Sequence, residues 1–492
     1  MNGIADFDVV IIGGGPAGTS AALRLLDMGH KVALIEQQIF PREQIGEALS
    51  PGIRNIFNYL NADHLLTDER YFSDLSASVI WESQSVQVVP PAQRGPGLMV
   101  NRGRFDSELI HLAVDRGLHL IQPAKMEWCK RKGGRWHIQI IKEGQSKVWT
   151  ATFILDARGR KGALLKNKII TATDTIAVWT HVSNNAFQNQ TIIEAVCEGW
   201  LWGGPVAGNQ FRIMAFADSA TLKTDSPAEL LLRFVTGSSL FEPAASSISG
   251  KHIQTCKVDS YCHDTPWEDN YIRLGETAFT LDPLSSTGVE KAMRISLQAA
   301  IAINTVLCGG DAQMARTFYE DRLIESVVTH AQWTADYYKH AWPETTLPFW
   351  KSRSEKKVTA SGNKTPFQER LIQLFKLNPK SAGNHLPENI NIRDVLEPLW
   401  YRQVKISPQL TFMKTVCIID DRLELRTAIM HPQLEREMAY LDQVELEPLL
   451  SKVANGDTFG DLIHKWGDRL PLQHAARICV KLNDLGILIP SV

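Results

Sequence analysis

Cysteine is scarce in this sequence and follows no pattern. The seven cysteines stand at positions 129, 197, 256, 262, 308, 417 and 479, and none belongs to a Cys-x-x-Cys pair. Disulfide frameworks and zinc ribbons depend on paired or regularly spaced cysteines, so the sequence favours neither class. We therefore expect free, mostly buried thiols and no metal site.

An excess of charge of one sign and a long apolar run are also missing. The 52 basic and 54 acidic residues give a net charge of −2, so no overall field favours a nucleic acid. No run approaches the roughly 20 apolar residues of a membrane span, and residues 1–6 lack the basic flank of a signal peptide. We expect a cytoplasmic protein that binds neither nucleic acids nor membranes.

The N-terminal residues carry the first positive signal. Phe7–Ile12 is a short apolar run that predicts a buried strand, and a glycine-rich turn follows at 13–18. The apolar spacing after the turn predicts a helix that ends near Gly29, and Lys31–Ile35 predicts a second strand with Glu36 at its end. These residues form a complete β-α-β unit.

The glycine-rich turn predicts a dinucleotide site. In Gly13-x-Gly15-x-x-Gly18 the first glycine permits the tight turn, the second lets the backbone approach a diphosphate, and the third allows close packing of helix and strand. The helix N-terminus offers free N–H groups to the phosphates. An acidic residue at the end of the second strand accepts hydrogen bonds from the adenosine ribose. The residues expected at the nucleotide are Gly13, Gly15, Pro16, Ala17, Gly18 and Glu36.

Four later segments form an ordered set within about the first 340 residues. They are Pro41–Glu47, Asn101–Asp106, Asp156–Arg160 and Gly275–Gly288. In this order they resemble the FAD-contacting motifs of the flavoprotein superfamily that holds p-hydroxybenzoate hydroxylase, geranylgeranyl reductases and flavin-dependent tryptophan halogenases. Glu276 stands where the superfamily usually has an aspartate, so a carboxylate is retained. The resemblance implies FAD as cofactor, with further contacts from Arg42, Gly46, Arg102, Asp156, Gly159, Glu276, Asp282, Pro283 and Gly288.

Two further stretches of sequence point to the halogenase branch of this superfamily. Gly199–Pro205 (GWLWGGP) resembles its "GWxWxIP" motif, and Leu281–Gly288 (LDPLSSTG) resembles its "LEPLxSTG" segment. The resemblance implies that tryptophans of the first motif wall a dry path between flavin and substrate. The alternative is that they are ordinary core residues. The residues implied for the substrate pocket are Trp200, Trp202 and Pro205.

Two departures from the halogenases favour hydroxylation. Residues 75–83 (LSASVIWES) match the strand on which halogenases place their lysine and contain none, and Ser285 stands where tryptophan halogenases have a glutamate. A serine cannot replace an ammonium group as a cationic donor. The sequence therefore favours an FAD-dependent monooxygenase that transfers oxygen from a flavin hydroperoxide to an electron-rich ring. A halogenase and a geranylgeranyl-reductase-like reductase remain as alternatives, as does a non-enzymatic protein with structural FAD.

The catalytic residues and the electron donor are less clearly marked. Glu47 and His181 are candidates because they stand in or near segments expected to line the flavin, although the strand-like surroundings of His181 favour a core histidine over a catalytic one. No second GxGxxG motif is present for a resident nicotinamide cofactor. Electrons are therefore expected from transiently bound NAD(P)H or from a separate flavin reductase, and dioxygen is the expected co-substrate.

The fold class expected is α/β, with three parts. A Rossmann-like FAD-binding domain comprises residues 1–75, 95–170 and 266–340, and an antiparallel β-sheet substrate domain comprising 76–94 and 171–265 is inserted into it. Residues 341–400 form a helical lid or linker, of which the polar stretch 351–365 is expected to be mobile. Residues 401–492 form a helical, winged-helix-like C-terminal module.

The C-terminal module bears on the substrate. Strands are expected at 415–419 and 423–429 and helices at about 445–454 and 472–485, with Asp457 capping another helix between them. This arrangement resembles the small peptide-recognition modules of peptide-modifying enzymes; the alternative is a helical cap or dimer contact. The resemblance implies an aromatic substrate on a peptide, protein or carrier. It is similar to the flavoprotein monooxygenases that oxidise a tryptophan during cysteine tryptophylquinone biogenesis.

Overall fold

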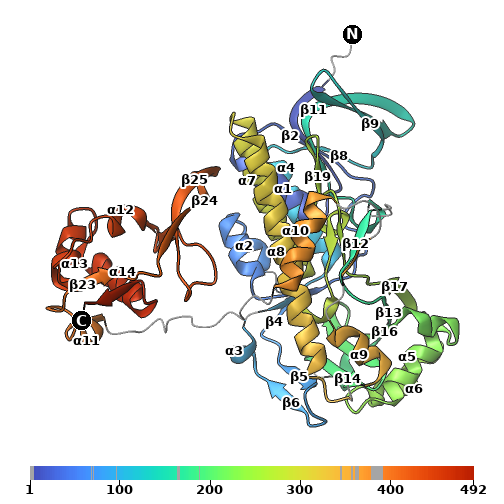
Figure 1. Ribbon diagram of the computed structural model, residues 1–492. Helices are drawn as coiled ribbons and strands as arrows, with labels where there is room; N and C mark the ends of the chain where they lie inside the picture. Colours follow the sequence, from blue (N-terminus) through green and yellow to red (C-terminus); the bar gives the residue numbers. More distant parts are fainter. Residues whose placement is uncertain are drawn as a thin grey trace. The chain divides into compact units, whose positions relative to one another are not determined.

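The computed structural model describes residues 5–67, 69, 71–95, 97–162, 167–187, 189–343, 346–355, 358–360, 365–377 and 392–491. The chain divides into two compact units, residues 1–377 and residues 378–492, and Figure 1 shows their helices and strands.

The first unit is built on a large sheet that matches the expected Rossmann-like domain. Its strands are β1 (Ala5–Ile12), β2 (Val32–Ile35), β8 (His119–Ile121), β9 (Lys125–Lys132), β10 (Arg135–Lys142), β11 (Gln145–Asp156), β19 (Trp267–Glu268) and β20 (Tyr271–Arg273). The order is β19-β20-β11-β1-β2-β8, and β1 pairs in parallel with both β11 and β2. Because a parallel sheet is covered on both faces, the segments at its centre, such as Val9–Ile12 and Val32–Ile35, are apolar and buried. The buried FDVVII run is this central strand.

Helices pack closely on the glycine-rich end of this sheet. They are α1 (Pro16–Asp27), α4 (Arg102–Asp115) and α7 (Gly288–Leu307). Helix α1 contacts both α4 and α7, and α7 runs beside the long α8 (Ala312–Lys339) (Figure 1). Gly18 makes the close approach possible, since a Cβ there would lie 2.1 Å from the carbonyl oxygen of Gly13. The predicted β-α-β unit is thus present, with its second strand one residue shorter than expected.

A second sheet of seven strands makes up the inserted domain. Its strands are β5 (Ala77–Ile80), β6 (Gln87–Val89), β13 (Thr175–Ser183), β14 (Thr191–Val196), β15 (Gly199–Val206), β16 (Gln210–Asp218) and β17 (Gln254–Lys257). The order is β17-β13-β16-β15-β14-β5-β6, antiparallel except for the β14–β5 pair. Helices α5 (Pro227–Thr236) and α6 (Ala245–Ile248) cover one face with an apolar core. The expected α/β fold class with an inserted, mainly antiparallel sheet is confirmed.

Short elements complete the first unit. Small sheets are formed by β3 (Ala48–Leu49), β4 (Phe72–Ser73) and β7 (Leu98–Met99), and by β12 (Lys168–Ile170), β18 (Tyr261–His263), β21 (Phe279–Thr280) and β22 (Thr359–Ala360). The remaining helices are α2 (Ile53–Tyr59), α3 (Pro91–Arg94), α9 (Pro348–Ser354) and α10 (Pro366–Lys376).

The start of the expected mobile stretch 351–365 is a packed helix instead. Trp350, in α9, is fully buried, and the buried Arg353 pairs with Asp218 at 2.7 Å. The guanidinium of Arg353 also lies over the ring of Phe349, 3.8 Å from its centre. The sequence did not reveal this packing, because a polar residue with a buried partner cannot be distinguished by residue type from one that is exposed to solvent. Residues 344, 345, 356, 357, 361–364 and 378–391 of the predicted lid lie outside the described residues.

The second unit has its own apolar core. Its elements are α11 (Ile392–Leu396), β23 (Val404–Ile406), β24 (Thr411–Ile419), β25 (Arg422–Met430), β26 (Tyr440–Leu441), β27 (Val444–Glu445), α12 (Glu447–Leu450), α13 (Phe459–Gly467), α14 (Leu472–Asp484) and β28 (Leu488–Pro490). Strands β24 and β25 pair as a hairpin, as the sequence predicts. Leu396, which we assigned to the linker, joins this core, so the unit begins before residue 401.

Two helix boundaries in the second unit differ from the prediction. The helix expected at 445–454 is confined to α12, because Val444–Glu445 pairs with β26. Helix α13 is capped by Thr458 rather than Asp457: the Thr458 hydroxyl accepts from the Asp461 N–H at 3.1 Å, and the Asp461 carboxylate accepts from the Thr458 N–H at 3.0 Å. Asp457 pairs instead with Lys465 at 2.7 Å.

Three observations concern features that the sequence lacks. Within the described part of the chain, no helix combines the length and the apolar character that a membrane crossing requires. The same residues contain no group of three or more His, Cys, Asp or Glu side chains arranged to hold a metal ion. None of the seven cysteines, all of which the structure describes, forms a disulfide.

Candidate active site

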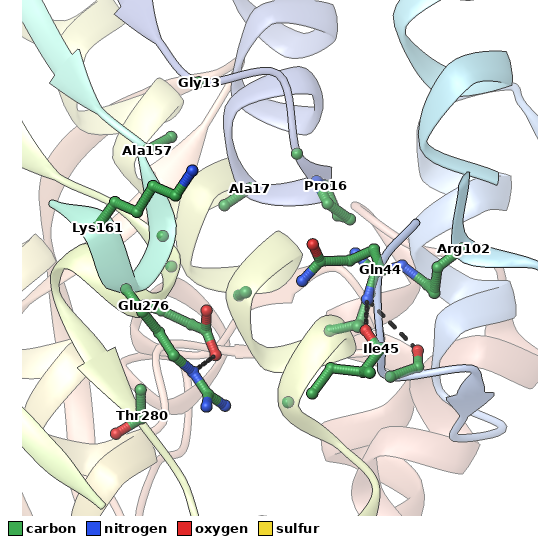
Figure 2. A pocket seen from close by; sticks show the side chains of 18 of the residues that line it. Gly13, Pro16, Ala17, Gln44, Ile45, Arg102, Ala157, Lys161, Glu276 and Thr280 are labelled. Carbon is green, nitrogen blue, oxygen red and sulfur yellow. Dashed lines mark hydrogen bonds and ion pairs between the residues drawn. The ribbon is translucent and has the colours of Figure 1, made fainter. Parts of the chain in front are cut away.

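A cavity of about 820 Å³ opens between the glycine-rich turn and one face of the seven-stranded sheet. Its lining comes from segments far apart in the sequence, four of which are the segments singled out above (Figure 2). Of the 20 residues predicted for cofactor, substrate or catalysis, the lining includes all except Gly18, Asp156, His181 and Pro205.

The glycine-rich turn has the shape that a diphosphate requires. Gly13 has a φ of +108°, and a Cβ there would lie 2.3 Å from the carbonyl oxygen of Ala157. At Gly15, in contrast, a Cβ would point into space, with the Arg42 guanidinium as its nearest neighbour at 3.6 Å. Gly15 precedes the first turn of α1 and provides no side-chain cap, so the helix N–H groups face the cavity uncovered. These residues fit the diphosphate of FAD.

Glu36 supports this turn directly. Its Oε2 accepts a hydrogen bond from the N–H of Gly14 at 2.7 Å, and its Oε1 accepts from the N–H of Gln38 at 2.8 Å. The side chain is buried and lines the cavity. Both carboxylate oxygens of Glu36 therefore already accept hydrogen bonds from backbone N–H groups. The contact of Glu36 with an adenosine ribose stays a prediction.

Arg102 fixes the segment that follows Arg42. Its guanidinium donates to the carbonyl oxygen of Ile45 at 3.0 Å (Figure 2) and forms a bidentate pair with Asp106, at 3.0 and 3.2 Å. Gly46 has a φ of +97°, and a Cβ there would come within 2.9 Å of Arg102. The arginine thus shapes the cavity wall as well as lining it.

The second predicted FAD motif forms the opposite wall. Glu276 pairs with Arg160 at 2.9 Å (Figure 2). Asp282 is buried and accepts hydrogen bonds from the Tyr338 hydroxyl, 3.1 Å from each carboxylate oxygen, and from the N–H of Leu284 at 3.0 Å. Burial raises the pKa of Asp282. Gly288, at the start of α7, would point a Cβ into open space.

Three of the predicted residues act behind the wall or away from it. Gly18 serves helix packing, as described above. Asp156 is fully buried, where it accepts from Tyr271 at 2.7 Å and pairs with Arg158 at 2.6 Å. It therefore braces the loop that carries Gly159 and does not reach the cavity. The prediction that Pro205 lines the pocket is wrong, because strand alternation turns it to the face opposite Trp200 and Trp202.

An aromatic wall closes the sheet side of the cavity. Trp200 and Trp202 line it together with Phe216, Met214 and Ala177. The Trp200 ring stacks on Phe216 with centres 3.9 Å apart and an interplanar angle of 12°. Trp200 and Trp202 thus fit both interpretations of the sequence, as core residues and as pocket residues. They pack in the same core as Trp81 and Trp350, and they also line the cavity.

Glu47 and His181 are brought together by an arginine that the sequence analysis missed. Arg212, on β16, donates to His181 Nε2 from its Nε at 3.1 Å and from its Nη2 at 2.9 Å, and its Nη1 pairs with Glu47 Oε1. Glu47 lines the cavity; His181 does not. Burial, assisted by Arg212 and opposed by Glu43, lowers the pKa of His181. The sequence did contain a signal for Arg212, because it is a lone arginine on the same strand face as Met214 and Phe216.

Basic residues of the Asp156–Lys161 loop were also missed. Arg158, Arg160 and Lys161 all line the cavity. In Figure 2 the Lys161 side chain extends beside Ala157, which itself borders the glycine-rich turn. Three cations within four residues, directly after a buried strand, were a visible signal for a site that binds phosphate.

Comparison with known proteins places these features in a family. The model of the tryptophan halogenase family matches residues 74–380. The model of the pyridine nucleotide-disulphide oxidoreductases matches residues 7–56, which hold the β1-α1-β2 unit and the start of the next segment.

Two relatives illustrate the similarity in sequence. Tryptophan 2-halogenase of Chondromyces crocatus is 25% identical over 337 residues, which cover 63% of this chain and 64% of the halogenase. The chain thus spans less than two thirds of that relative. The putative FAD-dependent oxidoreductase LodB of Marinomonas mediterranea is 26% identical over 316 residues, covering 60% of this chain and 84% of LodB.

Two solved structures share the fold along nearly the whole chain. The peptidyl tryptophan dihydroxylase QhpG, described as essential for tryptophylquinone cofactor biogenesis, matches with a TM-score of 0.73 and 19% identity over 98% of this chain and 100% of QhpG. The flavin-dependent halogenase CmlS matches with a TM-score of 0.68 and 20% identity over 99% of this chain and 96% of CmlS.

Proposed function

We propose that this chain, which belongs to the tryptophan halogenase family, is an FAD-dependent oxidoreductase that hydroxylates an aromatic substrate. The proposed substrate is an electron-rich ring, namely the indole of a tryptophan presented on a peptide, protein or carrier. The proposal rests mainly on one observation: the sheet face at the cavity is aromatic and carries no lysine among its lining residues.

That sheet face is fully described. The residues that line the cavity from it are Ala177, Trp200, Trp202, Met214, Phe216 and Cys256. Strand β5 (ASVI), where halogenases place their lysine, also contains none. A halogenase needs an ammonium group beside its substrate to handle hypohalous acid, and a serine or thiol supplies no such cation. The wall is suited to stack and enclose a ring instead.

The cavity does contain lysines elsewhere. Lys125 lies next to Ala124, whose N–H donates to the Glu36 carbonyl at 2.8 Å, and Lys161 lies beside Ala157 (Figure 2). Both positions border the glycine-rich turn and the end of β2, where the nucleotide half of FAD would lie. A cation there neutralises phosphate charge. Their place supports a role in cofactor binding.

The residues of the site suggest how the chain contributes to hydroxylation. Bound FAD, once reduced, supplies the activated oxygen. The glycine-rich turn holds the diphosphate. Trp200, Trp202 and Phe216 orient the ring and exclude water from it. Glu47 lines the cavity, and its Oε2 accepts a hydrogen bond from the N–H of Gly46 at 3.0 Å. The Glu47 carboxylate is the proposed acceptor of the proton that the ring loses when it is hydroxylated.

The proposal that the substrate is presented on a macromolecule has a separate basis. The match to QhpG, a peptidyl tryptophan dihydroxylase, covers residues of both units. The second unit folds around a core of its own, as a recognition module would. Electrons are proposed to come from a separate flavin reductase or from transiently bound NAD(P)H.

The test is a product analysis with free tryptophan and a tryptophan-containing peptide as probes. The protein is incubated with FAD, NADH and a flavin reductase in air, with and without bromide, and products are identified by mass spectrometry. We expect an added oxygen in the peptide whether or not bromide is present. A brominated product would establish the halogenase alternative, and turnover without dioxygen would establish the reductase alternative. Unaltered mass under all conditions would count against the proposal.

A further inference from the structure

Arg212 lies between the cavity wall and the far end of strand β13. It is buried and stands directly opposite His181 in the pairing of β13 with β16. Its three guanidinium nitrogens all have partners: Nε and Nη2 donate to the same imidazole nitrogen, and Nη1 reaches the Glu47 carboxylate. Glu47 comes from the segment before β3, far away in sequence. One side chain therefore joins the inserted sheet to the loop that lines the cavity.

The chemistry of the guanidinium determines the state of both partners. Arginine has only N–H donors, accepts no hydrogen bond and does not deprotonate in proteins. His181 Nε2 must therefore act as acceptor, so the imidazole is neutral and carries its proton on Nδ1. Glu47 Oε1 likewise accepts a hydrogen bond from Nη1. Neither partner can exchange a proton through Arg212.

We infer that Arg212 is a positioning residue, which holds the Glu47 carboxylate in place at the cavity wall, and that His181 serves as its second anchor. Two donors on a single acceptor fix the guanidinium plane, and the third nitrogen then fixes the carboxylate. The inference assigns His181 a role without contact to substrate or cofactor. It revises the prediction that His181 acts in catalysis directly.

The anchor works only while His181 is neutral. The charged groups that act on the imidazole are Arg212 from β16 and Glu43 from the segment before β3. If His181 were protonated, the contact would bring together two cations, the imidazolium and the guanidinium, and neither could accept a hydrogen bond. Protonation of His181 therefore releases Arg212, and the Glu47 carboxylate loses its fixed position.

A second buried arginine, which belongs to α9 and pairs with residues of the same sheet, provides a matched control. Arg353 pairs with Asp218 and donates to the Thr175 hydroxyl, both at 2.7 Å, so its removal also breaks a buried network on β13 and β16. It contacts neither Glu47 nor His181. Any effect that Arg212→Lys shares with Arg353→Lys reports stability alone.

The direct experiment is histidine nitrogen NMR of the full-length protein, with the His181 signal assigned by its loss in His181→Asn. We expect the Nδ1–H tautomer, and a His181 pKa that rises in Arg212→Met, rises less in Arg212→Lys, which keeps the positive charge, and does not rise in Arg353→Lys. If one of the two Arg212 variants fails to bind FAD, the His181 pKa in the other variant and the His181 tautomer in the wild-type protein still test the inference. An Nε2–H tautomer, or a His181 pKa indifferent to Arg212, would overturn the inference.

A second arm measures turnover and rests on the proposed function. Displacing a positioned group by about 1 Å costs about 10²-fold in rate, so Arg212→Lys should lower kcat about 10²-fold at saturating FAD. His181→Asn keeps an acceptor for the guanidinium and should retain most activity, whereas His181→Phe should not. The acid limb of the pH profile should follow the His181 pKa measured by NMR. Equal activity of the Asn and Phe variants would contradict the anchor, whereas failure of the proposed reaction would leave the NMR result intact.

Discussion

Tyr338 donates its hydroxyl to both carboxylate oxygens of Asp282, at 3.1 Å each. The tyrosine belongs to α8 and the aspartate to the segment before α7, and both are buried. On its other side the Tyr338 ring contacts Trp81 and Trp350, with centres 6.1 and 6.0 Å away. A single side chain thus connects the predicted FAD motif to the core that includes Trp81 and Trp350, on which the aromatic wall packs.

Tyr338→Phe should loosen this connection. The change leaves a buried carboxylate without its hydroxyl donor, which costs about 1–3 kcal/mol in the free energy of unfolding. Because Asp282 lines the cavity, the affinity for FAD should fall as well. Urea denaturation and fluorescence titration with FAD measure the two effects. Tyr319→Phe is the control, since Tyr319 is equally buried but donates to the backbone carbonyl of Arg273; it should lose stability without loss of affinity for FAD.

Two alanine substitutions in the glycine-rich turn should have different effects, one on the stability of the protein and the other on its affinity for FAD. At Gly13 the new Cβ collides with the backbone of Ala157 and the φ is strained, so Gly13→Ala should destabilise the protein itself. At Gly15 there is room in the protein alone, and Gly15→Ala should unfold like the wild type. Its Cβ occupies the space of the diphosphate, so FAD affinity should fall about tenfold or more, about 1.4 kcal/mol. Equal FAD affinity of Gly15→Ala and wild type would show that the diphosphate lies elsewhere.

Stability should fall on acidification because of two buried histidines. Burial lowers the pKa of His263 and of His330 to about 4 each, below the value of about 6.5 in the unfolded chain. The unfolded state therefore binds more protons as pH falls from about 6.5 towards 4, and stability is lost in that interval. Each histidine should cost about 2 kcal/mol between pH 7 and pH 5. Urea denaturation of His330→Gln should show a correspondingly flatter pH dependence; an unchanged slope would argue against a neutral His330.

Lys161→Ala separates a phosphate contact from a catalytic one. If Lys161 neutralises the diphosphate, the variant should bind FAD more weakly, by about 0.5–1 kcal/mol, and reach the wild-type rate at saturating FAD. The comparison needs FAD titration and a rate measured over a range of FAD concentrations. A rate that stays near zero at saturation, with halide present, would instead give this lysine the role that halogenases assign to theirs.

The sequence was sufficient wherever a feature is local. The glycine-rich turn and the acid at the end of β2 lie within one β-α-β unit, so spacing alone placed Gly13, Gly15 and Glu36 at the cavity. Resemblance added Arg102 and Asp282 in the same way. The error at Pro205 was avoidable, because Trp200 and Trp202 are an even number of positions apart and Pro205 is an odd number from both.

Features that depend on strand pairing could not be foreseen. Arg212 meets His181 because β16 pairs with β13 in one register, and it meets Glu47 because a distant loop packs on that strand. A shift by one residue would turn Arg212 to the other face. Likewise, Arg353 looked like part of a polar linker until its partner Asp218 was known. Long-range partners of buried charges are not encoded in local spacing.

The origin of the atom added to the substrate is the decisive test of hydroxylation at the aromatic wall. The protein, supplied with FAD, NADH and a flavin reductase, is given a tryptophan-containing peptide under heavy-oxygen-labelled dioxygen and saturating bromide, and the peptide is sequenced by mass spectrometry. We expect the label on the indole ring of tryptophan, and no bromine. A brominated indole, or an oxygen that comes from water, would contradict direct oxygen transfer at the aromatic wall.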